Sequence, residues 1–230
     1  MSGQNVSHRI IETKNKHSRA VLKDGTIEIR LARRLHPQEK EQHIQELLAR
    51  MTKAAMRQQA RTVINPFSEV DGPGLYTICT QHDQKITIEL TEGSETKLYK
   101  KSDQNWNGTI KNGFNKEVLK KLLWRKLGDY MNNFFIQEVQ AINRDTFQVP
   151  LTKISNRYAK TVWGSCAHHG GIMLNTALLF VPPHLLTYVI IHELAHRLEA
   201  NHSPKFWAQV ERFCPTYKED RKELRGYTLR

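Results

Sequence analysis

The stretch His192-Glu193-Leu194-Ala195-His196 says more about fold and chemistry than any other part of this 230-residue chain. In a helix, residues four apart lie on the same face one turn from each other, so both imidazoles can reach a single metal ion. Glu193 projects beside them, where its carboxylate can take a proton from an attacking water. The spacing therefore predicts a catalytic zinc site on a helix, with Glu193 as the general base.

The residues around this motif predict a buried helix that begins at Pro182-Pro183 and continues beyond the motif. Apolar residues recur at helical spacing from Leu185 to Leu198. Histidines on such an apolar helix would be costly to bury without partners, which favours a bound metal. We expect Asn201 to end this helix in the left-handed conformation and Ser203-Pro204 to begin the next one.

His202 and Glu199 are the two candidates for a third ligand. His202 follows the expected helix end directly, where its side chain can fold back toward the pair. Glu199 lies seven residues after His192, which is also on the ligand face if the helix is continuous. We favour His202 because imidazole is the most common metal ligand at neutral pH, and we expect Glu199 to be solvated or to contact a ligand. Three histidines would leave a fourth position for water, as catalytic zinc requires.

The interval from His196 to His202 equals that of the metzincins, but Glu199 stands at the position of their glycine. Since no methionine follows Met173, the methionine turn of the metzincins is also excluded. The site therefore belongs to another group of zinc enzymes.

Other segments occur in a fixed order around the motif, namely Trp163-Gly164-Ser165-Cys166, Gly171-Ile172-Met173-Leu174-Asn175, Val181-Pro182-Pro183 and Asn201-His202-Ser203-Pro204-Lys205-Phe206-Trp207. This succession resembles the YgjP-like metallopeptidases, a zincin group related to the SprT-like proteases. The resemblance is strong over residues 115–225, weaker at the basic hairpin of residues 14–33, and poor over residues 62–112. It implies a zinc-dependent hydrolase with His192, His196 and His202 as ligands and Glu193 as catalytic base.

Four further residues near the motif have expected roles, and a fifth has none. Cys166 is expected to be a buried structural thiol and not a ligand, because three histidines suffice. Trp163 and Asn175 are expected to pack and to hold the backbone near the active-site strand. Tyr188 is expected to lie in the core or beside a ligand, and Arg197 receives no role because it points away from the ligand face.

Composition sets broader limits. With 39% apolar and 25% charged residues, the chain has the composition of a soluble globular protein. Residues 1–16 contain no apolar segment typical of a signal peptide, and no run approaches the length of a membrane span. Three separated cysteines, Cys79, Cys166 and Cys214, argue for a reducing compartment. We therefore expect a cytoplasmic protein that does not associate with membranes.

The net charge of +12 is concentrated at the amino end, since residues 1–61 hold 13 Lys or Arg against 6 Asp or Glu. Such a segment can face an anionic partner: nucleic acid, a nucleotide or an acidic protein. Because no interleaving of aromatic and basic residues accompanies it, we favour a solvated basic surface and keep the anionic partner as the alternative.

Periodicity predicts a mixed architecture. A hairpin turn is expected at Lys23-Asp24-Gly25 and a helix from His36-Pro37 to about Arg61. A long amphipathic helix is predicted over residues 116–142, and residues 62–73 and 102–115 read as polar or turn-rich connections. Strands are predicted over residues 9–21, 26–31, 76–80, 86–90, 97–100, 148–154 and 160–162. The expected fold class is α+β, with a zincin-like catalytic domain over residues 113–230 built on an active-site helix and a smaller amino-terminal β-hairpin and strand region over residues 1–112.

The function predicted from these features is hydrolysis of peptide bonds in a peptide or protein substrate, with one catalytic Zn²⁺ and Glu193 as base. One alternative is a nucleotide phosphohydrolase (a pyrophosphatase) using the same metal site, although the site lacks the carboxylates that hold Mg²⁺ beside phosphates. Another is an SprT-like protease that acts near DNA. A third is an adaptor that retains a structural zinc, which would have no use for Glu193.

Overall fold

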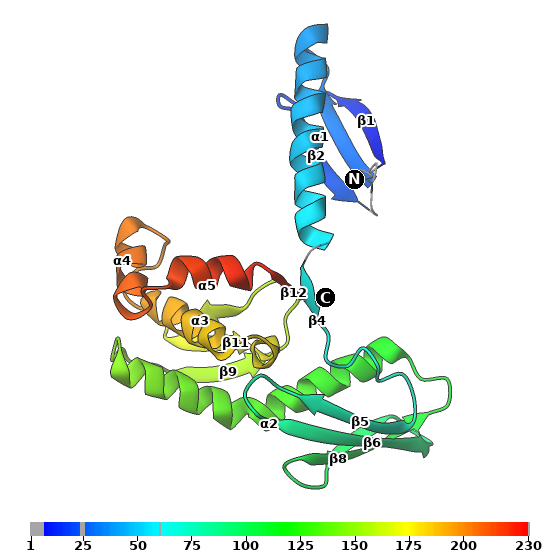
Figure 1. Cartoon of the computed structure of the whole chain (residues 1–230), viewed down its shortest axis with the longest axis vertical. Helices are drawn as coiled ribbons and strands as arrows, with labels where there is room; N and C mark the ends of the chain where they lie inside the picture. Colours follow the sequence, from blue (N-terminus) through cyan, green and yellow to red (C-terminus); the bar gives the residue numbers. More distant parts are fainter. Residues whose placement is uncertain (1–6, 24–25, 60, 230) are drawn as a thin grey trace. The chain divides into compact units, whose positions relative to one another are not determined.

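The computed structural model describes residues 7–23, 26–59 and 61–229, and the chain divides after Arg61 into two compact units (Figure 1). The first unit combines one helix with one small sheet, and the second combines several helices with small sheets, so the α+β class is confirmed. Among the described residues, none of the helices combines the length and apolar character needed to cross a bilayer.

The first unit consists of a three-stranded sheet and one helix. Its strands are β1 (His8–Thr13), β2 (Arg19–Lys23) and β3 (Thr26–Ala32), and its helix is α1 (Pro37–Gln59). β3 lies in the middle, parallel to β1 and antiparallel to β2. Helix α1 covers one face of the sheet, where Leu47 packs on Ile27 and Ile29. The single strand expected over residues 9–21 is thus two strands, and the expected Asp24-Gly25 turn lies outside the described residues.

The second unit begins with a four-stranded sheet in the order β5-β6-β8-β7. Its strands are β5 (Gly74–Cys79), β6 (Lys85–Gly93), β7 (Lys97–Lys100) and β8 (Asn105–Lys111). β8 lies in the stretch that the sequence led us to read as turn-rich, so that expectation was wrong. The strand predicted over residues 97–100 coincides with β7.

Helix α2 (Lys116–Asp145) runs along the two larger sheets of this unit (Figure 1). The side chain of Asn115 caps its amino end, and its buried face is that of an amphipathic helix. The helix packs against β7 of the first sheet and against β9 (Lys153–Arg157) of a second, three-stranded sheet. That sheet has the order β10-β11-β9, with β10 (Gly164–Cys166) at one edge and β11 (Gly171–Asn175) in the centre.

The strands expected over residues 148–154 and 160–162 need correction. Gln148 has a φ of 53°, a left-handed conformation that a strand does not contain, so the strand begins only at Lys153. Residues 160–162 form an irregular connection. The carbonyl oxygen of Val162 accepts a hydrogen bond from the Asn175 side chain and does not pair in a sheet.

The remaining elements follow as a short 3₁₀ helix η1 (Thr176–Phe180), then α3 (Pro183–Ala195), α4 (Pro204–Phe213), α5 (Tyr217–Leu224) and β12 (Tyr227–Leu229). β12 pairs in parallel with β4 (Thr62–Ile64), so the end of the chain closes onto the first residues of the unit. One hydrophobic core extends from Ile64 to Leu224 and includes both sheets and α2 to α5. The structure therefore places the division after Arg61 and not after residue 112, because a cut at 112 would pass through this core.

Candidate metal centre

Helix α3 carries both histidines of the motif and is buried on most of its surface. Pro183 occupies the first turn, and the helix ends at Ala195, with His196 as C-cap in helical conformation. The main-chain N–H of Leu198 bonds to the carbonyl of Ala195, three residues back, which tightens the turn that ends the helix. The helix is thus shorter than expected. Leu198, the last apolar residue of the predicted helix, lies beyond its end and is 52% exposed. Asn201 does not have the left-handed conformation that we assigned to it.

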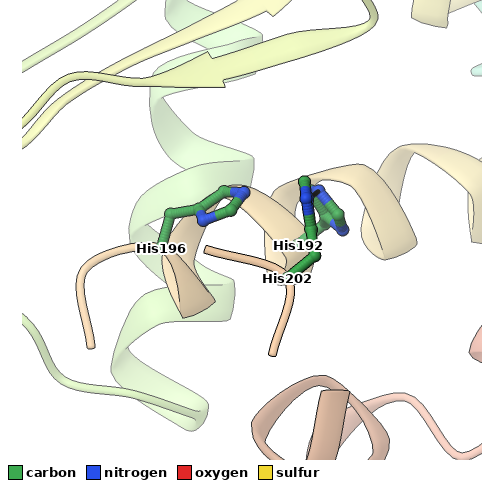
Figure 2. A group of neighbouring side chains, drawn as sticks. All are labelled: His192, His196 and His202. Atoms are coloured by element: carbon green, nitrogen blue, oxygen red, sulfur yellow. Dashed lines mark hydrogen bonds between the residues drawn. The ribbon is translucent and has the colours of Figure 1, made fainter. Parts of the chain in front are cut away.

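Three imidazoles meet beside the end of α3 (Figure 2). His192 and His196 come from the helix, and His202 comes from the loop that leads into α4. One ring nitrogen from each of the three lies within 4.8 Å of the others, and Nε2 of His192 is 3.1 Å from Nε2 of His202. His192 and His196 are partly buried whereas His202 is exposed, so the cluster reaches the surface. Among the described residues, it is the group of His, Cys, Asp or Glu side chains with the geometry to hold a metal ion.

Helix α4 holds this cluster together. Ser203 caps the helix, its hydroxyl accepting a bond from the Phe206 N–H at 3.3 Å, and this fixes the backbone directly after His202. The Phe206 ring is fully buried, and its centroid lies 4.9, 4.5 and 4.8 Å from those of His192, His196 and His202. The Trp207 ring stacks on His202 at 5.6 Å. All three imidazoles therefore pack against a single aromatic side chain.

The donor set fits a zinc ion. Nδ1 of His196 lies 3.1 Å from the Glu199 carbonyl oxygen, so Nδ1–H donates there and Nε2 keeps a lone pair that could bind a metal. Burial lowers the pKa of His192 to about 3, and burial also lowers the pKa of His202, which favours the neutral imidazoles that bind metals. In tetrahedral zinc sites with Zn–N bonds of about 2.0–2.1 Å, ligand nitrogens are about 3.3 Å apart, close to the separation between His192 and His202.

Glu199, the rival third ligand, takes part through its main chain only. Because α3 ends at Ala195, the continuous helical face that would carry position 199 toward the metal does not exist. Its carbonyl accepts from His196, and its carboxylate is not part of the histidine cluster.

Glu193 is buried, with 6% of its surface exposed, and burial raises the pKa of its carboxyl to about 7. Its carboxyl group lies against the backbone of Gly164 in β10. A Cβ at position 164 would be 2.7 Å from Oε1 and 2.8 Å from Cγ of Glu193, closer than side-chain atoms approach. Gly164 therefore leaves the space that the Glu193 carboxyl occupies.

The neighbouring residues tie this region to the sheet. Nη1 of Arg197 donates to the His168 carbonyl at 2.7 Å, which links the end of α3 to the turn between β10 and β11. Asn175 donates to the carbonyls of Ala159 and Val162 at 2.7 and 2.6 Å, so its expected role in holding the backbone is confirmed. Tyr188, 4% exposed, lies in the core as expected.

Three contributions escaped the sequence reasoning. Arg197, to which we assigned no role from the sequence, bonds through Nη1 to the His168 carbonyl. The sequence analysis named Gly164 only as part of the segment Trp163-Gly164-Ser165-Cys166, although a glycine in a short strand is a signal of close backbone approach. In the sequence, Phe206 was one apolar position of a predicted helix, and nothing there indicates that its ring would contact three histidines.

Cys166, which we expected to be buried, is only half-buried, and burial raises the pKa of its thiol.

Among solved structures, the metallopeptidase zymogen abylysin of Pyrococcus abyssi is similar over 39% of this chain and 90% of that chain, with 25% identity and a TM-score of 0.36. Wss1 of Saccharomyces cerevisiae is similar over 47% of this chain and 82% of that chain, with 17% identity and a TM-score of 0.30. The search of curated proteins gave no match. The model of the YgjP-like metallopeptidase domain matches residues 15–227, and this chain therefore belongs to the YgjP-like metallopeptidase family.

Proposed function

We propose that this protein is a zinc metallopeptidase whose single catalytic zinc is held by His192, His196 and His202, with Glu193 as general base. The observation that carries the proposal is the convergence of three ring nitrogens within 4.8 Å at the end of the helix that also carries a buried glutamate. A site that only stabilised the fold would have no use for that carboxyl group.

The roles of zinc, Glu193 and His196 follow from the arrangement of the site. Zinc, when bound, supplies a Lewis acid that polarises the scissile carbonyl and makes water more acidic. Glu193 accepts the proton of the attacking water and delivers it to the leaving amine. A carboxyl with its pKa near 7 suits both steps, because it can gain and lose a proton near neutral pH. The bond from Nδ1 of His196 to the Glu199 carbonyl fixes the orientation of this ring, so Nε2 stays directed at the cluster.

An edge strand beside Glu193 supports a peptide as substrate. Among the described residues, β10 pairs with β11 alone, so its other edge is available to a further strand. Gly164 of this strand contacts the Glu193 carboxyl, and Ser165 is exposed. An extended peptide that adds to this edge as a further strand would pass next to the proposed base. A nucleotide has no comparable backbone to pair there.

The proposed setting is a reducing compartment such as the cytoplasm. Cys79, Cys166 and Cys214 are all free, and none forms a disulfide. This agrees with the compartment expected from the sequence.

Metal analysis combined with activity on a peptide library and a nucleotide panel tests the proposal. We expect one zinc per chain and peptide cleavage that falls about 10²–10⁴-fold in Glu193→Gln. Glu199→Gln is the matched control, since it also neutralises a carboxylate near His196 but one outside the cluster, and it should retain activity. Nucleotide hydrolysis without peptide cleavage would overturn the choice of substrate, and full activity of Glu193→Gln would overturn the mechanism.

The ligand assignment has its own test. His202→Ala should lose zinc on dialysis against a weak chelator, whereas Glu199→Ala should keep it. The reverse result would reassign the third ligand to Glu199.

A further inference from the structure

A hollow of about 770 Å³ lies at one edge of the sheet in the first unit, far along the chain from the histidine cluster. Residues 13–16 and 32–35 line it. β1 and β3 are parallel, so their carboxyl ends meet at the same edge, and the two segments that leave these strands form the walls. The crevice outside the carboxyl ends of parallel strands is a common location for a ligand.

The lining is strongly basic. Four of its eight residues are cationic and exposed: Lys14, Lys16, Arg33 and Arg34. The nearest carboxylate is Glu12, which lies 2.6 Å from Lys40 and 3.8 Å from Arg33, so one negative charge is shared by two cations. Within the described residues, Lys14, Lys16 and Arg34 have no carboxylate partner. Among the described residues, the hollow therefore carries more positive charge than Glu12 neutralises.

The open face of the sheet continues this basic surface. Ile27 and Ile29 point toward α1, so Glu28 and Arg30, which alternate with them along β3, point to the face that α1 leaves uncovered. Arg9 of β1 stands opposite Glu28, and Arg19 of β2 stands opposite Arg30. Glu28 is 4% exposed and pairs with both Arg9 and Arg30, so the acidic side chain is covered while the arginines remain accessible.

We propose that the first unit binds the phosphate backbone of nucleic acid, with Lys14, Lys16, Arg33 and Arg34 around the hollow and Arg19 and Arg30 on the adjoining face. The proposal is independent of the chemistry at the histidine cluster. For the basic segment it adopts the anionic partner, which the sequence left as the alternative to a solvated surface.

The composition of the hollow favours a nucleic acid over other anions. The hollow is much larger than one phosphate group, and residues 13–16 and 32–35, the described part of its lining, include no aromatic ring on which the base of a free nucleotide would stack. Among these described lining residues the apolar ones are Ala32 and Leu35, whereas protein–protein interfaces have apolar, aromatic-rich centres. Flexible cations without stacking partners suit repeated phosphates, so binding should depend on salt and little on base sequence.

The test is fluorescence anisotropy with the full-length, zinc-loaded protein and labelled duplex DNA, single-stranded DNA and single-stranded RNA of mixed sequence. We expect dissociation constants on the order of 10⁻⁶ to 10⁻⁴ M near physiological salt, tightening as salt is reduced. Lys14→Gln/Lys16→Gln should weaken binding about tenfold at low salt and should reduce the slope of log K against log salt by about 1.4–1.8, the value for two lost phosphate contacts. Arg34→Gln is a second variant in case the double variant folds poorly. Arg33 is left intact because it contacts Glu12.

Arg50→Gln/Lys53→Gln is the matched control. It removes the same charge from exposed positions of α1 that lie about 20 Å along the helix from its start beside the hollow. This control should change affinity less than about twofold. Equal losses in the control and in the hollow variants, or failure of all three nucleic acids to bind at low salt, would overturn the proposal. Binding of polyglutamate as tight as that of nucleic acid would overturn it in favour of an acidic protein partner. Melting temperature and zinc content, which need no enzyme activity, verify that each variant is folded.

Discussion

A methyl group at position 164 would fall 2.7 Å from Oε1 of Glu193, so the smallest possible substitution probes the placement of the proposed base. Gly164→Ala must shift the carboxyl or the strand, and a displacement near 1 Å lowers rates by about 10²-fold. We expect kcat/KM for peptide cleavage to fall about 10–100-fold while zinc content stays unchanged, because the three imidazoles are not displaced.

Gly72→Ala is the control for this substitution, because a Cβ at position 72 meets no atom within 4 Å. It should be as active as the unmodified protein. If Gly164→Ala also kept full activity, the contact between Gly164 and Glu193 would have no role in catalysis.

The three free cysteines should differ in reactivity. Cys79 is exposed, whereas Cys214 is buried, and burial together with the neighbouring Asp220 carboxylate raises the pKa of the Cys214 thiol to about 11. At pH 8 the thiolate fraction of Cys214 is then about 10⁻³, so alkylation should label Cys79 quickly and Cys214 only after denaturation. Mass spectrometry of timed samples measures this, and Cys79→Ser should remove the rapid phase. Rapid labelling of Cys214 in the folded protein would contradict the burial of this site.

At the scale of elements, the cap of α4 sets the position of the third proposed ligand. Ser203→Ala removes the hydroxyl that accepts from Phe206, which should cost about 1 kcal/mol of stability and loosen the backbone next to His202. Zinc affinity, measured by competition with a chelator, should fall as well. Asn115→Ala removes the corresponding cap of α2 and should cost similar stability without changing zinc affinity. Equal zinc affinities in the two variants would show that the α4 cap does not position His202.

Elements with strong periodicity could be predicted from the sequence, and those made by distant pairing could not. The helix from Lys116 was predicted because a long amphipathic pattern of apolar residues begins there. β8 was missed because Asn105, Asn107 and Thr109 resemble a loop and Gly108 resembles a turn. In the structure, Gly108 is buried within the strand, where a Cβ would lie 2.6 Å from the Lys97 carbonyl. The glycine therefore marked close strand packing, which local sequence does not distinguish from a turn.

The candidate site, too, could be predicted from the sequence only where its geometry depends on local spacing. The motif gave His192, Glu193 and His196 as candidates because their roles follow from spacing within one helix. The relation of His202 to them depends on where α3 ends, which was misplaced by several residues. The Phe206 contact with all three histidines depends on the angle between α3 and α4, and this angle is set by packing across the core and not by local sequence.

At the scale of the whole molecule, the division after Arg61 predicts which fragment can fold. Residues 62–230 retain the β4–β12 pair and the buried Phe67, whose ring contacts Trp124 of α2 at 5.2 Å. This fragment should be soluble, melt cooperatively and bind one zinc, while losing the proposed affinity for nucleic acid. A fragment of residues 113–230 would lack the sheet that covers α2 and would expose Leu123 and Trp124, so it should aggregate. Expression of both fragments, followed by size-exclusion chromatography, melting and zinc analysis, measures the difference. If residues 113–230 alone formed a stable zinc-binding domain, the core shared by the two sheets would not be a single folding unit.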